Sequence, residues 1–302
     1  MIVDVHCHTP SHRDLVPPDE MVVNTAWRPD RAVAATTTWA DYARDVEGAG
    51  VDVSLVYLLA AGREATGLPV DPARINDQTA EFVAANPSHR IGFTSVHPDD
   101  PGAIKELERS TGDLGLKGIK LGPNYQNFDP LSPSAFRLYG HAETHRLPIV
   151  FHQGTSPMRT APLRYAHPLV MDEIAIRFPE LRIVMAHLGH PWQADTITVI
   201  RKHPHVYADV SAAIYRSWSF YSAMRLATEW GVLEKLLFGS DYPIATSGET
   251  LTGLRGLNDI PRRTGLPEIP EAAIEAIIER DSLALLGLER PAGLAHRMIA
   301  AS

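Results

Sequence analysis

Five side chains of the types that bind divalent metals stand directly after apolar runs of the chain. His6 and His8 end the first run, and in an extended strand they share one side because successive side chains point to opposite faces. The other three are His152, His187 and Asp241, each followed within a few residues by Gly or Pro. Imidazole nitrogens and carboxylate oxygens are the usual ligands of zinc and its neighbours. The His-x-His pair alone also fits two packing histidines, but the five residues together predict a metal site.

The elements that must position these side chains follow a simple alternation of apolar runs and stretches with room for a helix. The runs are residues 1–8, 51–59, 91–96, 116–121, 147–151, 181–186, 206–210 and 233–238. The expected helices are residues 39–50, 75–85, 103–109, 133–145, 169–178, 193–202, 220–230 and 271–286. This alternation predicts an α/β fold of βαβ units around a parallel sheet.

Eight such units in one chain of 302 residues predict a (β/α)₈ TIM barrel as a single domain over residues 1–302. A doubly wound open sheet is the competing architecture. No Gly-x-Gly-x-x-Gly follows any of the runs, so its dinucleotide-binding version has no support. A barrel carries its function at the carboxyl ends of its strands, where at least four of the five candidate ligands are expected to converge.

Four longer phrases give the sequence a family resemblance. They are Gly118-Ile119-Lys120-Leu121-Gly122-Pro123, Phe151-His152-Gln153-Gly154, Ala186-His187-Leu188-Gly189-His190-Pro191-Trp192 and Phe238-Gly239-Ser240-Asp241-Tyr242-Pro243. With the His-x-His pair, they resemble the amidohydrolase superfamily and its amidohydrolase-related branch. That branch includes aminocarboxymuconate-semialdehyde decarboxylase, related decarboxylases, a pyrone-dicarboxylate lactonase and predicted hydrolases. The resemblance runs from Met1 to about Leu288.

The resemblance implies a distorted TIM barrel and one divalent metal ion per chain, with zinc preferred and manganese the alternative. The implied ligands are His6, His8, His152 and Asp241. A divalent ion activates water and polarises a carbonyl group. Asp241 is then expected to accept a proton, and His187 to hydrogen-bond the substrate oxygen or protonate the product. The alternative for His187 is that it only orients a metal ligand.

Lys120 stands on the fourth predicted strand, where binuclear members of the superfamily carry a carboxylated lysine that bridges two metals. The Gly-Ile-Lys-Leu phrase also occurs in the mononuclear branch that this chain resembles more. We therefore expect one metal and a structural or substrate-facing Lys120.

Several residues in the loops after the strands are candidates for substrate contacts. They are Arg63, Arg159, Trp192, Tyr215 and Arg216. An arginine in such a loop suits a substrate carboxylate, although a solvated surface arginine fits equally well. His190 precedes a proline and is expected in a supporting role, and the segment from Pro10 to Thr38 is a candidate lid. Cys7, the single cysteine, is expected to point away from the two histidines.

Composition limits the partners. The net charge is −8 and no cluster of Lys and Arg occurs, which argues against nucleic acid or an anionic membrane as the main partner. The sequence has no apolar run long enough for a transmembrane helix and no signal-peptide pattern. The single cysteine fits a reducing cytoplasm. We expect a small-molecule substrate, and a homodimer is possible.

The leading hypothesis is a metal-dependent hydrolase that cleaves a lactone, ester or amide bond of a small, carboxylated substrate through a metal-activated water. The first alternative is a non-oxidative decarboxylase of an aromatic or unsaturated acid on the same residues. The decarboxylases of this branch often have Gly-Gly after the strand-six histidine, where this chain has Leu188-Gly189, and this departure favours hydrolysis. The second alternative is a catalytically silent metal-binding barrel.

Overall fold

The computed structural model describes residues 1–10, 28, 30–33, 37–60 and 71–294. The predicted alternation of strands and helices is confirmed. The strands are β1 (Val3–His8), β2 (Val53–Tyr57), β3 (Arg90–Gly92), β4 (Ile119–Leu121), β5 (Ile149–Phe151), β6 (Ile183–Met185), β7 (Val206–Asp209) and β8 (Leu236–Leu237). Most are shorter than the apolar runs that predicted them.

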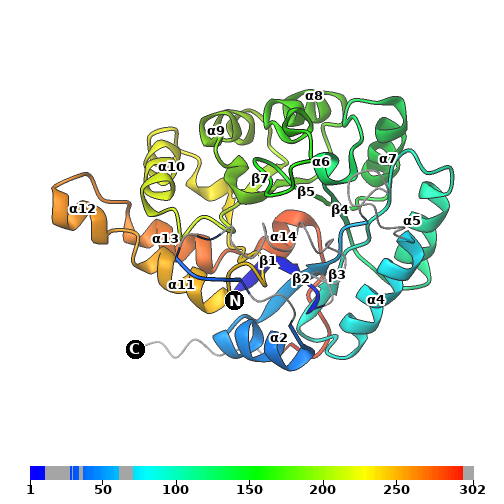
Figure 1. Cartoon of the computed structure of the whole chain (residues 1–302), viewed down its shortest axis with the longest axis horizontal. Coiled ribbons are helices and arrows are strands. Elements are labelled where there is room, and N and C mark those ends of the chain that lie inside the picture. Colours follow the sequence, from blue (N-terminus) through cyan, green and yellow to red (C-terminus); the bar gives the residue numbers. More distant parts are fainter. Residues whose placement is uncertain (11–27, 29, 34–36, 61–70, 295–302) are drawn as a thin grey trace.

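Most of the α-helices lie around these strands, and α14 lies in their middle (Figure 1). They are α2 (Trp39–Asp45), α4 (Pro72–Ala84), α5 (Ala103–Gly112), α6 (Pro123–Gln126), α7 (Pro133–Thr144), α8 (Leu169–Arg177), α9 (Gln193–Lys202), α10 (Ser217–Glu229), α11 (Ser247–Arg255), α12 (Asp259–Thr264), α13 (Glu271–Ile278) and α14 (Ser282–Leu286). Short 3₁₀ turns are η2 (Glu47–Ala49), η3 (Leu163–Ala166), η4 (Ala186–Gly189) and η5 (Leu233–Lys235). Among the described residues, no helix has the length and apolar character that a membrane span requires.

All strand pairs are parallel, in two sheets of order β1-β2-β3 and β4-β5-β6-β7-β8. Isolated bridges join the sheets at both seams, between Thr94 and Ile119 and between Cys7 and Tyr242. At the second seam the Val5 amide also donates to the Phe238 carbonyl at 3.0 Å. The eight strands therefore form the expected barrel, distorted at the two seams.

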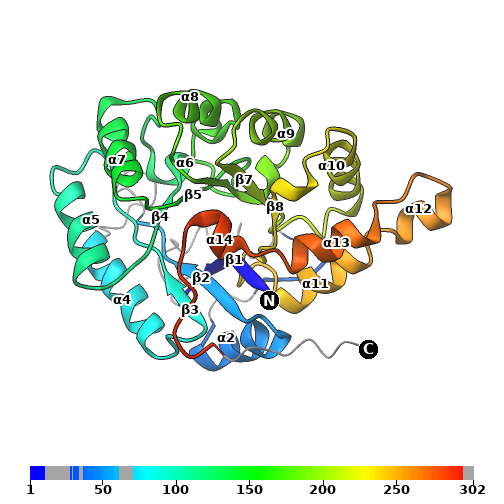
Figure 2. The same cartoon turned by 180° about the vertical axis from the view of Figure 1, so that it is seen from behind.

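The interior of the barrel holds a separate apolar core. Its members include Val3, Val53 and Ile91 near the amino ends of their strands, and Leu283 and Leu286 of α14 pack among them. Helix α14 crosses the middle of the strand ring in both views (Figure 2). It therefore closes the amino-terminal end of the barrel and leaves the carboxyl-terminal end for the site.

The prediction of one helix over residues 271–286 is wrong, because the chain breaks between α13 and α14. The Asp281 side chain accepts a hydrogen bond from the Ala284 amide and begins a new helix. Ile274, Ile277 and Ile278 pack in the outer core, whereas Leu283 and Leu286 enter the barrel interior. One straight helix could not serve both cores.

Strand β1 contains the local irregularity that aims the two histidines. Asp4 pairs with Ser54 and Cys7 with Val56, so β1 has one residue more than β2 between these pairs. Val3 and Val5 lie in the interior core, whereas Cys7 lies in the outer core. After Val5, the extra residue reverses which side chains of the strand point into the barrel. It turns His6 and His8 inward and Cys7 outward, as expected for Cys7.

Candidate metal centre

His6, His8 and Asp241 meet at the carboxyl end of the barrel. The Nε2 atoms of His6 and His8 lie 3.2 Å and 3.3 Å from Asp241 Oδ1, and all three residues are buried. One ligand atom of each lies within 4.8 Å of the others. This is the convergence that the sequence predicted for these three residues.

The arrangement fits a cation better than a hydrogen-bonded cluster. His6 Nε2 is buried and makes no hydrogen bond to any described residue, even though the Asp241 carboxylate is adjacent. A buried nitrogen without a partner is costly, and a divalent ion between this nitrogen and the carboxylate would satisfy both. His6, His8 and Asp241 are therefore the residues that would hold a divalent ion.

Asp209, at the end of β7, orients His6 and was missed by the sequence analysis. His6 Nδ1 lies 2.9 Å from Asp209 Oδ2, so it donates its proton there and keeps the Nε2 lone pair for a cation. Burial lowers the pKa of His6, but the Asp209 carboxylate outweighs burial and raises it. The sequence signal was an acid followed by Val-Ser at the end of an apolar run, like that of the recognised ligands.

The backbone that presents Asp241 lies in the left-handed region, with φ of +67°. A non-glycine residue adopts this conformation at a cost of order 1–3 kcal/mol, and such residues cluster at functional sites. The Asp241 amide donates to the His6 carbonyl at 2.8 Å, which ties the carboxylate to the strand that carries the histidines. The strained backbone conformation therefore goes together with a fixed position of the Asp241 carboxylate beside β1.

His187, in η4 after β6, reaches the same site through hydrogen bonds. Its Nδ1 lies 2.8 Å from Ser211 Oγ, and its backbone amide donates to Asp209 Oδ1 at 2.9 Å. The ring centroids of His187 and His6 are 4.8 Å apart. The structure therefore places His187 beside the candidate metal ligands, and the partners of its backbone amide and its Nδ1, Asp209 and Ser211, come from the end of β7.

His152 is adjacent to His187 rather than part of the three-residue group. Its Nδ1 lies 3.2 Å from His187 Nε2, and its Nε2 lies 3.1 Å from the Thr155 carbonyl oxygen. The Tyr125 ring covers it, with centroids 4.5 Å apart. The role of His152 as a fourth ligand stays a prediction.

The charges of the site suit metal binding at neutral pH. Burial lowers the pKa of His8 and of His187 to about 4, and that of His152 well below its usual range. Burial alone would raise the pKa of Asp241, but the adjoining imidazoles outweigh burial and hold it well below its usual range. A neutral His8 and a neutral His152 beside an ionised Asp241 are the protonation states that a metal requires.

Lys120 lies inside the barrel next to these ligands. Its side chain is buried and its Nζ makes no hydrogen bond to a described residue. The Nζ atom lies 4.8 Å from the centroid of the Tyr57 ring, which also contacts the rings of His6 and His8. Burial lowers the pKa of Lys120 to about 8. Tyr57 was not singled out from the sequence, because an aromatic residue in an apolar strand is ordinary.

Tyr215 and Arg216, both predicted to contact substrate, lie together in the loop after β7. The guanidinium carbons of Arg216 and Arg28 are each 4.6 Å from the centroid of the Tyr215 ring. Arg28 is buried and is held by Glu249 of α11, at 3.2 Å. This stack joins the segment after β1 to the loop after β7.

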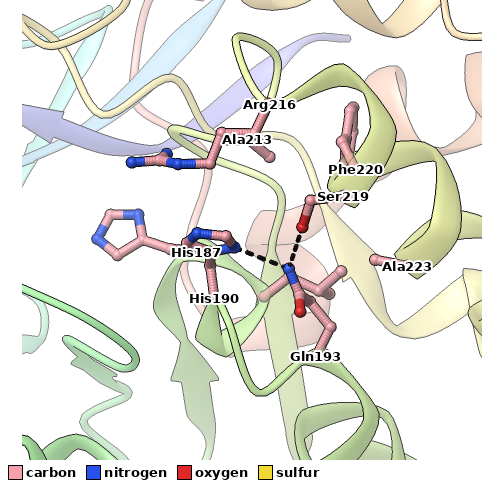
Figure 3. Close-up of a pocket in the computed structure, with 9 residues that line it drawn as sticks. His187, His190, Gln193, Ala213, Arg216, Ser219, Phe220 and Ala223 are labelled. Carbon is pink, nitrogen blue, oxygen red and sulfur yellow. Dashed lines mark hydrogen bonds between the residues drawn. The ribbon is translucent and has the colours of Figure 1, made fainter. Parts of the chain in front are cut away.

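A small cavity is lined by His187, His190 and Arg216, among other residues (Figure 3). It measures about 10 Å³, which is room for about one water molecule. Gln193 spans its wall, with its amide nitrogen 2.9 Å from His190 Nδ1 and 3.0 Å from Ser219 Oγ. Figure 3 shows Arg216 on the same side of the cavity as the rings of His187 and His190. His190 therefore takes a supporting position beside His187.

The other residues predicted to contact substrate are Trp192, Arg159 and Arg63. The Trp192 ring contacts the His167 ring in a tilted arrangement, with centroids 4.9 Å apart. Arg159 is exposed and has no hydrogen bond or ion pair with a described residue. Arg63 and most of the Pro10–Thr38 segment lie outside the described residues.

Sequence comparison connects this chain to a described family. The model of the amidohydrolase family matches residues 3–288. A curated relative, 2-amino-3-carboxymuconate-6-semialdehyde decarboxylase of Dictyostelium discoideum, is 23% identical over 248 residues, which cover 71% of this chain and 66% of the relative. The matched region thus spans slightly less than two thirds of that relative.

Solved structures share the fold at low identity. An uncharacterised TIM-barrel protein from Bordetella bronchiseptica has a TM-score of 0.69 at 20% identity, covering 95% of this chain and 99% of the other. A probable 2-pyrone-4,6-dicarboxylic acid hydrolase from Acinetobacter baumannii has a TM-score of 0.64 at 15% identity, with coverages of 95% and 99%. A dihydroxybenzoic acid decarboxylase from Polaromonas, solved with manganese and an inhibitor, has a TM-score of 0.64 at 16% identity, with coverages of 95% and 96%.

The barrel, the ligands at its strand ends and the match over residues 3–288 agree with one another. The chain belongs to the amidohydrolase family.

Proposed function

We propose that this enzyme is a metal-dependent, non-oxidative decarboxylase of a small unsaturated or aromatic carboxylic acid. The observation that carries the proposal is the match to a decarboxylase over 71% of the chain. The leading hypothesis from the sequence was hydrolysis, and the relatives favour the decarboxylase alternative instead.

The sequence feature that had favoured hydrolysis loses its weight in the structure. Leu188 stands where related decarboxylases often have the first glycine of a pair, yet its φ is +49°, and Gly189 follows at +63°. Both residues adopt the left-handed backbone that glycine takes without strain. Leucine at position 188 therefore leaves the loop in a glycine-like conformation, and the replacement is no argument for a different reaction.

The donor set would hold one divalent ion through His6, His8 and Asp241, with His152 as the proposed fourth ligand. Zinc remains our preference, and the manganese in the Polaromonas decarboxylase makes manganese the alternative. Such an ion orients a substrate carboxylate and withdraws electron density from it when bound.

The residues of the chain supply the proton chemistry. Decarboxylation breaks the bond between carbon and carboxylate, leaves the electron pair on that carbon, releases CO₂ and forms a C–H bond. His187 Nε2 faces the site and can carry the required proton from solvent to the carbon. Lys120, with its ammonium group inside the barrel, would attract an anionic substrate. Arg216 lines the same small cavity as His187 and would attract a substrate carboxylate.

The second candidate is hydrolysis of a lactone, because one structural neighbour is a probable 2-pyrone-4,6-dicarboxylic acid hydrolase. In that reaction His187 Nε2 would accept the proton of the attacking water.

One experiment separates the two reactions. The metal-loaded enzyme is incubated in D₂O with hydroxybenzoates and unsaturated dicarboxylates, and separately with lactones and esters. A decarboxylase releases CO₂ and places one deuterium on the carbon that lost the carboxylate. Acid release from a lactone without CO₂ would replace the proposal with the second candidate. His187→Asn should abolish the active reaction in either case, and His205→Asn, at a surface ion pair with Glu180, is the matched control.

A further inference from the structure

Ser211 stands between the two side chains that matter most for proton transfer. Its hydroxyl oxygen lies in close contact with Asp209 Oδ1 and 2.8 Å from His187 Nδ1. Ser211 is fully buried, and its backbone amide donates to the same Asp209 oxygen at 3.0 Å. The amide and the hydroxyl of Ser211 therefore meet at one carboxylate oxygen, which fixes the position of the hydroxyl.

The direction of each hydrogen bond follows from counting protons. Asp209 accepts from the His6 ring, the His187 amide and the Ser211 amide, and an ionised carboxylate has no proton to give. The single proton of the Ser211 hydroxyl must then lie between Ser211 and Asp209. The same oxygen can meet His187 Nδ1 only as an acceptor, so Nδ1 must carry the ring proton.

We propose that Ser211 is a positioning residue that fixes the protonation site of His187, placing the ring proton on Nδ1 and leaving Nε2 as a proton acceptor that faces the site. Its part in turnover rests on the proposed function, whereas the position of the proton does not. A neutral His187 then begins the reaction as a base and delivers a proton only after it has first taken one up. This revises the sequence expectation that His187 donates directly to the substrate oxygen.

The contact with His152 agrees with this assignment. With Nε2 of His187 unprotonated, the neighbouring His152 Nδ1, at 3.2 Å, can act as the donor. A neutral His152 has one proton and faces two acceptors, His187 Nε2 and the Thr155 carbonyl. As a metal ligand, His152 would donate from Nε2 to the Thr155 carbonyl and keep Nδ1 for the ion, which leaves the His187 lone pair available to a substrate proton.

The test reads the proton position directly. Protein labelled with ¹⁵N-histidine is examined by long-range ¹H–¹⁵N correlation, which distinguishes the two neutral tautomers of imidazole. It is studied loaded with zinc, which is diamagnetic, and after chelation, and the His187 signals are assigned from the spectrum of His187→Gln. We expect His187 to show a protonated Nδ1 and a bare Nε2. A protonated Nε2 in the wild-type protein would overturn the proposal.

Variants separate positioning from simple structural support. Ser211→Ala should lose the single tautomer, Ser211→Thr should keep it because the hydroxyl remains, and Ser110→Ala, at a buried serine bonded to Thr94, should leave it unchanged. An unaltered His187 tautomer in Ser211→Ala would refute the role.

If a decarboxylated or hydrolysed substrate is found, kcat should fall at least about tenfold in Ser211→Ala, with KM and zinc content retained. If no substrate of either class reacts, the proposed function fails while the tautomer result still stands or falls by itself.

Discussion

The ammonium nitrogen of Lys120 lies 4.8 Å from the centre of the Tyr57 ring, with no hydrogen-bond partner among the described residues. A cation over an aromatic face recovers only part of the hydration that it loses on burial. The buried Lys120 ammonium group thus lowers the stability of the fold, and it lies where it would attract an anionic substrate.

Lys120→Met should therefore stabilise the metal-free protein. Burial lowers the folded-state pKa to about 8 from 10.5, so the folded chain binds fewer protons than the unfolded chain between these values. The stability of the wild-type protein consequently rises with pH across this window. At pH 7 the variant should be more stable by roughly 2 kcal/mol, and this gain should shrink by pH 10. Urea unfolding at both pH values measures it.

Lys117→Met is the matched control, because Lys117 is exposed three residues earlier in the chain. It should change stability little at either pH. A Lys120→Met protein less stable than the wild type at pH 7 would show that the ammonium group is well accommodated.

Metal content should depend on the three converging ligands. Protein purified without chelator is expected to hold one divalent ion per chain, and His8→Ala or Asp241→Asn should lose it, because neither leaves a complete ligand set. Elemental analysis after dialysis measures the content, with His205→Ala as the surface control. Full occupancy in Asp241→Asn would contradict the assignment.

His152→Ala addresses the fourth ligand separately. Weaker zinc affinity, by a factor of about 10 to 100, would support ligation or close support by His152. Competition with a chromogenic chelator gives the affinity. Unchanged affinity would restrict His152 to its contact with His187.

Gly154 should not tolerate a side chain. Its φ is +93°, and a Cβ atom would lie 2.1 Å from the His190 carbonyl oxygen, so Gly154→Ala must push apart the loops after β5 and β6. We expect a loss of about 3 kcal/mol in thermal or urea unfolding. Gly115→Ala is the control: its φ is +70° but nothing lies within 4 Å, so it should cost only about 1 kcal/mol. Equal losses would mean that backbone conformation alone matters.

Glu249 should make stability depend on acid pH. Burial alone would raise its pKa, but Arg31, the Thr246 amide and Arg28 outweigh burial and lower it to about 2 from 4.5. Its contribution is thus present above pH 4.5 and is lost as pH falls towards 2. Because the side chain is partly exposed, Glu249→Gln should cost only about 1 kcal/mol at pH 7.

The cost of Glu249→Gln should be smaller at pH 3 than at pH 7, as urea unfolding would show. Glu229→Gln, at an exposed pair with Arg225, serves for comparison. A constant difference between wild type and Glu249→Gln at all pH values would exclude ionisation of Glu249 as the cause.

The sequence predicted the fold because each strand and helix has its own local pattern. It predicted His6, His8 and Asp241 because a ligand at a strand end interrupts an apolar run visibly. It did not predict Asp209 and Ser211, whose importance lies in contacts to residues about 200 and 24 positions away. Such pairings are set by strand order and register, which no local window contains.

The break before α14 was missed for a related reason. The apolar spacing of residues 271–286 is continuous, and only the need to fill two separate cores divides it. Likewise, simple alternation in β1 correctly puts His6 and His8 on one side, but it cannot say which side faces the barrel.

The extra residue of β1 lets one short strand face the barrel interior with odd-numbered residues, Val3 and Val5, and with even-numbered ones, His6 and His8. Without the extra residue to reset the alternation, a strand that keeps Val3 and Val5 inward would turn both imidazoles toward the outer helices, with every ligand still present in the sequence. The metal centre therefore depends on how β1 pairs with β2 as much as on the identity of its ligands.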